Sequence, residues 1–538
     1  VVAPFVNETG DSTLDKVGRF AADWITQGLA ETGFAAVVDS RTVRQLVPPS
    51  GTSVGKPALG TSGWIARATR SGLLVEGAYY REGPSAVRLQ VRVVDARNDH
   101  LLRAIAPVHA VIAALQPALN ELRQRTMAAL ATLRDPREAG LAAHSSQPPT
   151  FAAYQEYATG EELFIRRDWR GAIEHFQRAS ALDSAYVLPL IWVSVAAIQI
   201  DQPAKADSIV RRLEAVRGRL TATDLAMLDW LGAYLGGDRI GAYQASRRLR
   251  DLAPGSEAEY QLGVEALRIG RPRETIAASA NLDPTLGAMN GRYDYWNTLT
   301  AAEHLLGRHD RELRDARRGV AQYPENLTTM LGLVRALAAL GREHDVAEAL
   351  DASESLPSTR RVTPGLLMRT AALELREHGH PDAARAASTR AIRWYRAQPA
   401  HIRDNAANQE GLARALYLAG QWDEAQRIFA RLVSPDTASV DDLGYLGVLA
   451  ARRDDRDEAV RISDRLAHLD RPYLWGQATC WRARIAALLG ERVRAVELLR
   501  AAAAEGYRYA WDHHADPDLE TLRDFPPFVT LIRPKEME

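Results

Sequence analysis

The chain has 538 residues, a formal net charge of −1, 46% hydrophobic residues and one cysteine. This length is too great for a single hydrophobic core, so two or more structural units are expected. The balanced charge argues against a general surface for nucleic acid or for anionic membranes. The lone Cys480 excludes an internal disulfide and is expected to pack in the core.

Arginine far outnumbers lysine and alanine is abundant, a composition typical of bacteria with GC-rich genomes. The longest nearly apolar stretch, residues 187–200, contains Pro189, Ser194 and Gln199 and is too short to span a membrane. The chain starts with Val-Val-Ala-Pro and not with methionine. We therefore expect a membrane anchor or a further domain to precede residue 1.

Residues 1–134 are predicted to form a small α/β domain. Apolar residues recur at helical spacing over 13–32. Two alternating runs, 73–80 and 86–94, flank a Gly-Pro turn and predict a β-hairpin. The other expected elements are an apolar run at 1–6, a strand at 34–38, a loop at 48–63, a short helix at 64–69, a third strand at 99–105 and a helix at 108–133 that is kinked near Pro117.

The segment Asn7-Glu8-Thr9-Gly10-Asp11 precedes the first predicted helix. Such a segment is compatible with a phosphate-binding loop or with a turn that leads into a helix cap. Because it contains a single glycine, we favour the turn.

The N-terminal region resembles a known bacterial family. The residues that carry the resemblance are Pro4-Phe5-x-Asn7-x-x-Gly10-Asp11, the helix that follows, Gly72–Gly77 and Arg88–Asp95. They look like the TolB-amino-terminal-like (FlgO-like) α/β module. In that family the module lies between an output domain and tetratricopeptide repeats, in membrane-linked Ser/Thr kinases, class III adenylate cyclases and winged-helix regulators. The resemblance implies a module that is not itself an enzyme.

From Phe151 onward, helix signals follow one another without strand signals. In 411–429 an apolar run, a Gly-Gln turn and a second helix with Ala425 four residues before Phe429 form a unit typical of tetratricopeptide (TPR) repeats. Small residues recur in the second helices 34 or 36 residues apart, and these are Ala172, Ala206, Ala242, Ala425, Ala459 and Ala495.

This pattern predicts a mainly α protein with four parts. They are an α/β domain at 1–134, a Pro- and Ser-rich linker at 135–150, a solenoid of about nine or ten TPR helix pairs at 151–510, and a C-terminal cap at 511–538. The middle of the solenoid, 255–400, follows the spacing poorly. Tyr154, Tyr157 and Phe164 are predicted to form the seam against the first domain.

One pattern resembles a metal site, namely Asp512-His513-His514-x-Asp516-x-Asp518. Adjacent histidines on a helix point about 100° apart and cannot easily bind one ion, so a surface or capping role is favoured. His378-Gly379-His380 is expected in a solvated turn. We find no phosphate-binding, kinase or hydrolase motif. We therefore predict no catalytic residue, cofactor, metal site, nucleic-acid partner or small-molecule substrate.

A TPR solenoid binds partners on its concave face, which the first helix of each pair supplies. The repeat frame places Asn297, His304, Arg414, Tyr417 and Arg452 on this face, and we predict that they bind a protein partner. The predicted function is a protein-interaction scaffold in the extracytoplasmic (periplasmic) part of a membrane-associated bacterial protein, with a cytoplasmic location left open. Two alternatives stay open: the sensory region of a kinase or adenylate cyclase, and a structural subunit of a large membrane complex.

Overall fold

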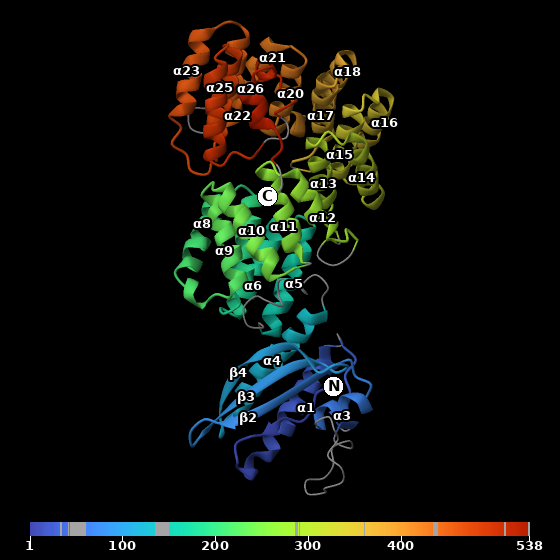
Figure 1. The fold of residues 1–538 in the computed structure, drawn as a ribbon, viewed down its shortest axis with the longest axis vertical. Helices are drawn as coiled ribbons and strands as arrows, with labels where there is room; N and C mark the ends of the chain where they lie inside the picture. Colours follow the sequence, from blue (N-terminus) through green and yellow to red (C-terminus); the bar gives the residue numbers. More distant parts are fainter. Residues whose placement is uncertain are drawn as a thin grey trace. The chain divides into compact units, whose positions relative to one another are not determined.

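The computed structural model describes residues 1–32, 35–40, 42–43, 61–134, 150–254, 256–285, 289, 291–359, 361–433, 439–509 and 513–535 (Figure 1). These residues form two compact units. One comprises Val1–Leu228 with Asp251–Glu257, and the other contains Asp229–Arg250, Ala258–Thr285 and the described residues from Met289 onward. The chain is mainly α, with a small N-terminal sheet followed by an α-solenoid of TPR-type helix pairs.

The N-terminal sheet has four strands in the order β1-β2-β3-β4. They are β1 (Val6–Asn7), β2 (Leu73–Arg81), β3 (Ala86–Asp95) and β4 (His100–Val111). Strand β1 is parallel to β2, whereas β2, β3 and β4 form an antiparallel meander. The hairpin predicted at 73–94 is present, with Leu73 opposite Asp95 and Arg81 opposite Val87.

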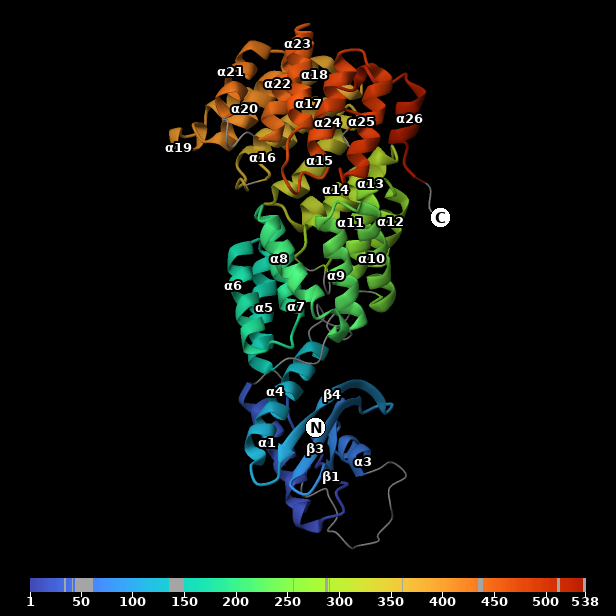
Figure 2. The same cartoon turned by 90° about the vertical axis from the view of Figure 1, so that its left-hand side faces the viewer.

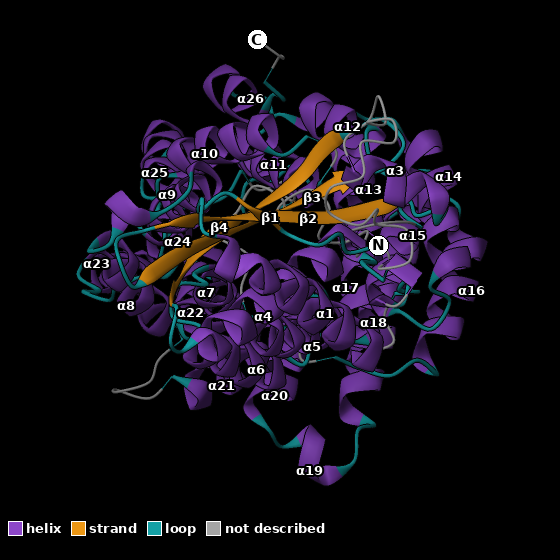
Figure 3. Ribbon diagram, turned by 90° about the horizontal axis from the view of Figure 1, so that it is seen from below, coloured by secondary structure: helices purple, strands orange, loops and turns teal. Residues whose placement is uncertain are grey.

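Helices cover both faces of this sheet, which Figure 3 shows nearly edge-on. Because side chains alternate along a strand, Val75 and Val93 face one side, where α1 (Asp15–Thr32) and α4 (Leu115–Arg134) pack. Leu74 and Val94 face the other side, against α3 (Thr61–Ala68). The turn before α1 acts as a cap: η1 (Ser12–Leu14) begins where Asp11 Oδ1 accepts a hydrogen bond from the Thr13 amide at 3.0 Å.

Three predictions in this region were wrong. Residues 35–38 are not a strand, and residue 34 lies outside the described part. The helix expected from Val108 starts at Leu115, because β4 continues to Val111 with Val108 and Ala110 buried and His109 exposed. Pro107 is tolerated there since β4 is an edge strand. Residues 61–63 belong to α3, while the rest of the expected loop, 48–60, is not described.

Ten helix pairs follow in the described residues after position 149. They are α5 (Phe151–Ile165) with α6 (Trp169–Leu182), α7 (Leu188–Gln199) with α8 (Pro203–Glu214), α9 (Ala222–Leu235) with α10 (Arg239–Leu252), α11 (Glu257–Arg268) with α12 (Pro272–Ala280), α13 (Asp294–Leu305) with α14 (His309–Gln322), α15 (Leu327–Ala339) with α16 (Glu343–Glu354), α17 (Pro364–Glu377) with α18 (Pro381–Arg396), α20 (Ala406–Leu418) with α21 (Trp422–Leu432), α22 (Val440–Arg452) with α23 (Arg456–Ala467), and α24 (Gln477–Leu488) with α25 (Arg492–Ala504).

The turn inside each pair has a constant backbone. The residue two positions before the second helix has a positive φ in all ten described turns, from +58° at Asp201 to +86° at Gly379. Glycine occupies seven of these positions because a left-handed conformation costs it little, and Arg167, Asp201 and Asp454 occupy the others.

The fourth residue of each second helix lies against the first helix of its pair, and we call it the anchor. The six predicted alanine anchors are all fully buried. In the middle of the solenoid the anchors are Thr275, Glu312, Val346 and Ala384, and all four are buried. The regular spacing of alanines is not visible there for two reasons. Three of these anchors are not alanine, and α19 (Ala400–Arg403) lengthens the step from Ala384 to Ala425.

Several further expectations concern the solenoid interior. Cys480 is fully buried in an apolar cluster, as predicted. The rings of Tyr157 and Phe164 pack on Phe176, Tyr186 and Trp192 within the repeats, and Tyr154 is buried; that these three residues form the seam with the first domain stays a prediction. No helix among the described residues combines the length and the apolar content that crossing a bilayer requires.

Close helix approach gives a stability prediction at Gly444 of α22. A Cβ atom there would lie 2.1 Å from Cδ2 of the buried Trp481 in α24. Gly444→Ala should therefore destabilise the protein by about 1–3 kcal/mol, measured by chemical unfolding followed by circular dichroism. The control is Gly232→Ala in α9, where a Cβ meets nothing within 4 Å. It should be neutral or stabilise by up to about 1 kcal/mol. Equal stabilities of the two variants would contradict the prediction.

Candidate partner-binding groove

The predicted partner-binding residues lie on first helices: Asn297 and His304 on α13, Arg414 and Tyr417 on α20, and Arg452 on α22. Four of them contact charged or aromatic residues of this same chain, and three of these four contact the C-terminal segment. We call this segment, residues 513–535, the tail. Asn297 is half-buried, and its Oδ1 makes no hydrogen bond to the described residues.

Tyr417 and Arg452 hold Asp518 of the tail. The Tyr417 hydroxyl donates to Asp518 Oδ1 and accepts a hydrogen bond from Arg452 Nε at 2.5 Å. Arg452 also donates an Nη2 hydrogen bond to Asp518 Oδ1 at 2.6 Å and another to the Pro517 carbonyl at 2.9 Å. Burial and the carboxylate of Asp518 hold the pKa of Tyr417 well above its usual range, so the phenol keeps its proton.

The other acidic residues of the tail are paired in the same way. Asp516 accepts a hydrogen bond from Arg484 of α24 at 2.7 Å, and Glu520 forms an ion pair with Arg376 of α17 at 2.5 Å. Arg492 of α25 donates to Asp524. Each of the four carboxylates between 516 and 524 therefore meets an arginine of the repeats.

The apolar side of the tail covers the last helix pair. Leu519, Leu522 and Phe528 are fully buried in one cluster with Cys480 and Leu499 of α24 and α25. Figure 2 shows α26 (Pro526–Ile532) beside α25.

Two backbone hydrogen bonds join the C-terminal part of the chain to the end of α11. The Tyr509 amide donates to the Arg268 carbonyl and the Lys535 amide donates to the Gly270 carbonyl, both at 2.7 Å. This part of the chain therefore contacts early as well as late repeats of the second unit.

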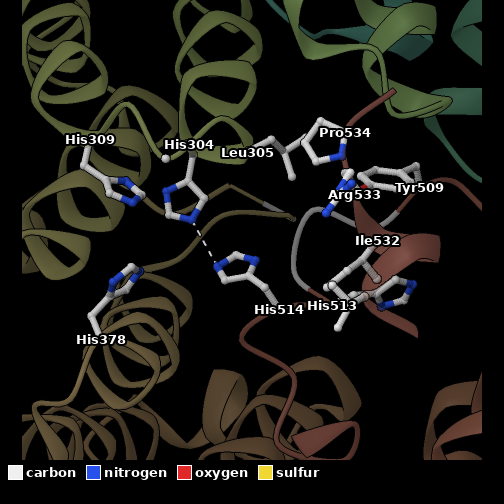
Figure 4. Close-up of a pocket in the computed structure, with 12 residues that line it drawn as sticks. His304, Leu305, His309, His378, Tyr509, His513, His514, Ile532, Arg533 and Pro534 are labelled. Atoms are coloured by element: carbon white, nitrogen blue, oxygen red, sulfur yellow. Dashed lines mark hydrogen bonds between the residues drawn. The ribbon is translucent and has the colours of Figure 1, made fainter. Parts of the chain in front are cut away.

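His304 lies in a buried cluster that the sequence did not predict (Figure 4). Its Nδ1 is 2.9 Å from Glu312 Oε2, and its Nε2 is 3.3 Å from Glu374 Oε2 and 3.2 Å from Nε2 of His514. The rings of His309 and His378 lie beside them, with centroids 5.1 Å apart. The cavity next to this cluster, of about 370 Å³, is also lined by His513, Tyr509 and Arg533.

The charged groups in this cluster shift one another's pKa values. Burial alone would lower the pKa of His304, but hydrogen bonds to Glu312 and Glu374 outweigh it and raise the pKa to about 9. Burial would raise the pKa of Glu374, but the rings of His304 and His514 hold it well below the usual range. In this cluster the imidazoles of His304 and His514 thus alternate with the carboxylates of Glu312 and Glu374.

Glu312 is the anchor of its helix pair and the centre of a second network. Burial would raise its pKa, but Arg335, His304 and His309 lower it to about 2. Arg335 Nε donates to Glu312 Oε1 at 2.7 Å, and both side chains are fully buried. Because a buried guanidinium neutralises it, the carboxylate can occupy a position that holds alanine in seven of the other nine helix pairs.

Arg414 lines a separate cavity of about 420 Å³. It pairs with Glu410 and with Asp441, the latter at 2.8 Å, and its guanidinium lies 5.4 Å from the ring centre of Tyr445. Five arginines and one aspartate line this cavity, together with aromatic rings: Tyr234, Arg239, Arg268, Arg414, Asp441, Tyr445, Leu474, Trp475, Gln477, Trp481, Arg484, Gly506, Tyr507 and Arg508.

The metal-like sequence pattern is divided in the structure. His514 joins the buried cluster, whereas His513 stacks on Tyr507 with an interplanar angle of 15°. Asp516 and Asp518 bind arginines, and Asp512 lies outside the described residues. Glu312 and Glu374 were missed because nothing in the local sequence distinguishes them from solvent-facing glutamates of other helices.

Comparisons with known proteins add little. No protein-family model matches the chain, and no curated protein matches it. Similar solved structures include a tetratricopeptide repeat protein from Parabacteroides merdae, with 13% identity, TM-score 0.28, and coverage of 56% of this chain and 98% of that one. Human IFIT1, as a dimer with m7Gppp-AAAA, has 12% identity, TM-score 0.32, and coverage of 66% and 90%. The APC/C hetero-tetramer Cut9-Hcn1 has 12% identity, TM-score 0.28, and coverage of 75% and 85%. These TM-scores carry no argument, so the fold rests on the helix pairs themselves.

The Glu312–Arg335 pair gives a second stability prediction. Glu312→Ala introduces the residue found at seven other anchors, yet it should destabilise the protein by about 3–5 kcal/mol because the buried Arg335 loses its carboxylate. The double variant Glu312→Ala, Arg335→Met removes both charges and should recover a large part of this loss. Urea unfolding of both variants and the wild type measures the difference. Full stability of the single variant would contradict the prediction.

Proposed function

We propose that the chain is a non-catalytic scaffold that binds an extended acidic polypeptide segment along the inner face of its solenoid. One observation carries this proposal: Asp516, Asp518 and Glu520 of the tail pair with arginines of first helices, and Asp524 pairs with Arg492 at the start of the second helix α25. The tail thus acts as a bound acidic peptide that happens to belong to the same chain.

The chemistry of the inner face favours carboxylates over other groups. Arginine presents a rigid fork of donors, and hydrogen bonds between charged groups are worth more than neutral ones. The adjoining cavity, where five arginines line the wall with one aspartate, extends the same preference. Its aromatic rings offer flat apolar surface for side chains between the acidic positions.

The tail also competes with any partner for the inner face. A covalently attached segment competes at an effective concentration that reaches the millimolar range. Only a partner that binds the inner face more tightly than the tail therefore displaces it, whereas a weaker partner would have to use the cavity beside it.

A labelled peptide with the sequence of 513–525 tests the preference for acidic segments. It should bind the double variant Asp516→Asn, Asp518→Asn at least 10-fold more tightly than the wild type, because the variant's own tail competes less. A peptide with the four acidic residues changed to Asn or Gln should bind that variant at least 10-fold more weakly. Fluorescence anisotropy gives both affinities.

Two further variants, made in the Asp516→Asn, Asp518→Asn background, control for charge. Arg452→Gln removes a residue that contacts the tail, whereas Arg427→Gln removes an exposed arginine from α21, a second helix. Only Arg452→Gln should weaken peptide binding. Equal affinity for the acidic and the neutral peptide, or equal effects of both substitutions, would overturn the proposal.

We propose further that the protein is membrane-associated and that this region is extracytoplasmic in a bacterium. The support is the order of an α/β module before helical repeats, which resembles the arrangement in membrane-linked signalling proteins. The sensory region of a Ser/Thr kinase or adenylate cyclase, and a structural subunit of a membrane complex, are the alternatives. Gentle purification from membranes with mass spectrometry separates them. Stoichiometric companions favour a subunit or adaptor, and a longer chain with a catalytic domain favours the sensor.

A further inference from the structure

We infer that His304, Glu374 and His514 form a binding site for a divalent cation of the zinc class. The three residues come from α13, α17 and the tail, far apart in sequence, and their ligand atoms lie within 4.8 Å of one another. Figure 4 shows the rings of His304 and His514 facing one another across the site.

The distances between the ligand atoms fit a tetrahedral ion. His304 Nε2 and His514 Nε2 are 3.2 Å apart, and Glu374 Oε2 lies 3.3 Å from the first and 3.5 Å from the second. Two ligands that each lie about 2.0–2.1 Å from a tetrahedral zinc ion are about 3.3–3.4 Å apart. The ion therefore fits between the three atoms without a rearrangement of the helices.

Each ligand atom is suited to that role. Glu374 Oε2 is buried, and the Nε2 atoms of His304, His514 and His378 lie 3.3, 3.5 and 3.7 Å from it. His304 Nδ1 is already engaged with Glu312 Oε2 at 2.9 Å, so Nδ1 keeps its proton and a bound ion takes the place of the proton on Nε2. Two imidazoles and one carboxylate form a known catalytic-type zinc ligand set that leaves one coordination position open.

The residues behind the ligands have the arrangement that zinc sites use. A metal-binding histidine usually donates its other ring N–H to a carboxylate, which fixes the ring. Glu312 fills that role for His304, and Arg335 fixes Glu312 in turn at 2.7 Å.

A second group, His304, His309 and Glu312, is also compact, but it is a poorer choice. Its separation of 2.9 Å between His304 Nδ1 and Glu312 is that of a hydrogen bond, and the buried Arg335 beside Glu312 repels a cation. The group His344, Asp345 and Glu348 has two exposed members on α16 and lacks a comparable second layer, so it serves as a control.

The open position has two occupants within reach. His378 Nε2 is 3.7 Å from Glu374 Oε2 and makes no hydrogen bond in the described structure. The cavity of about 370 Å³ next to the cluster admits water or a small ligand. A bound ion would thus join the tail, through His514, to α13 and α17, and would hold the tail in the inner face of the solenoid.

Zinc titration of the chelator-treated full chain tests the site. We expect one tight equivalent of Zn²⁺ by competition with a chromophoric chelator. His514→Ala should weaken it at least 100-fold. This variant is suitable because the His514 side chain is 28% exposed and lies outside the repeat helices. Glu312→Gln, which keeps the first ligands, should weaken binding by about 10–100-fold. His344→Ala should leave the affinity unchanged.

Cobalt gives a second readout on the unmodified protein, and it does not depend on how the variants fold. Co²⁺ at this site should show the intense visible absorption of four-coordinate cobalt, and excess Zn²⁺ should remove it. Absence of tight Zn²⁺ binding, the weak spectrum of six-coordinate cobalt, or loss of binding in His344→Ala with retention in His514→Ala would each overturn the proposal.

Proteolysis separates the ion from the partner proposed above. With Zn²⁺ the tail of the wild type should be cleaved at least 10-fold more slowly than with EDTA, and His514→Ala should lose this protection. A tail that is equally protected in both conditions would show that an ion does not hold it. This outcome would leave the proposal of acidic-peptide binding unaffected.

Discussion

The constraint on which this solenoid depends is the close approach of the two helices in each pair. It is met by a left-handed turn residue and, five positions later, by an anchor that lies against the first helix. Alanine meets the demand by being small. Glu312 meets it in a different way, since Arg335 and His304 surround its carboxylate. The anchor that is not a small residue thus belongs to a network of buried charged groups, as expected if local sequence rules fail at special sites.

Much of the fold follows from the sequence by simple periodicity. The hairpin of 73–94, the first helix and the alanine anchors were all predictable from spacing. The error at β4 arose because Val108 and Ala110 fit both a helix and an alternating strand, and only pairing with β3 decides between them. In the middle repeats the anchor is a poor signal, whereas the turn glycines Gly270, Gly307, Gly341 and Gly379 keep a fixed position before each second helix. A search based on the turn would have kept the register.

The site was predictable only in part. The repeat frame placed His304, Arg414, Tyr417 and Arg452 on first helices, but not what they contact. Tyr417 and Asp518 are 101 positions apart, and His304 and His514 are 210 apart. Such pairs form because the tail folds back onto the repeats, and no local sequence pattern predicts this. The same return explains why a doubtful metal motif in the sequence contributes one histidine to a cluster whose other members belong to α13, α14 and α17.

The constant interval between the turn residue and the anchor also determines where this protein tolerates inserted residues. Between pairs the chain varies freely, and α19 is an example of extra residues that leave the next anchor in place. Within a pair, a single inserted residue between turn and anchor would rotate the second helix by about 100° and turn its apolar face to water. Loops for a fluorescent label, a spacer or a circular permutation therefore belong in connections such as residues 397–405, and not in the short turns.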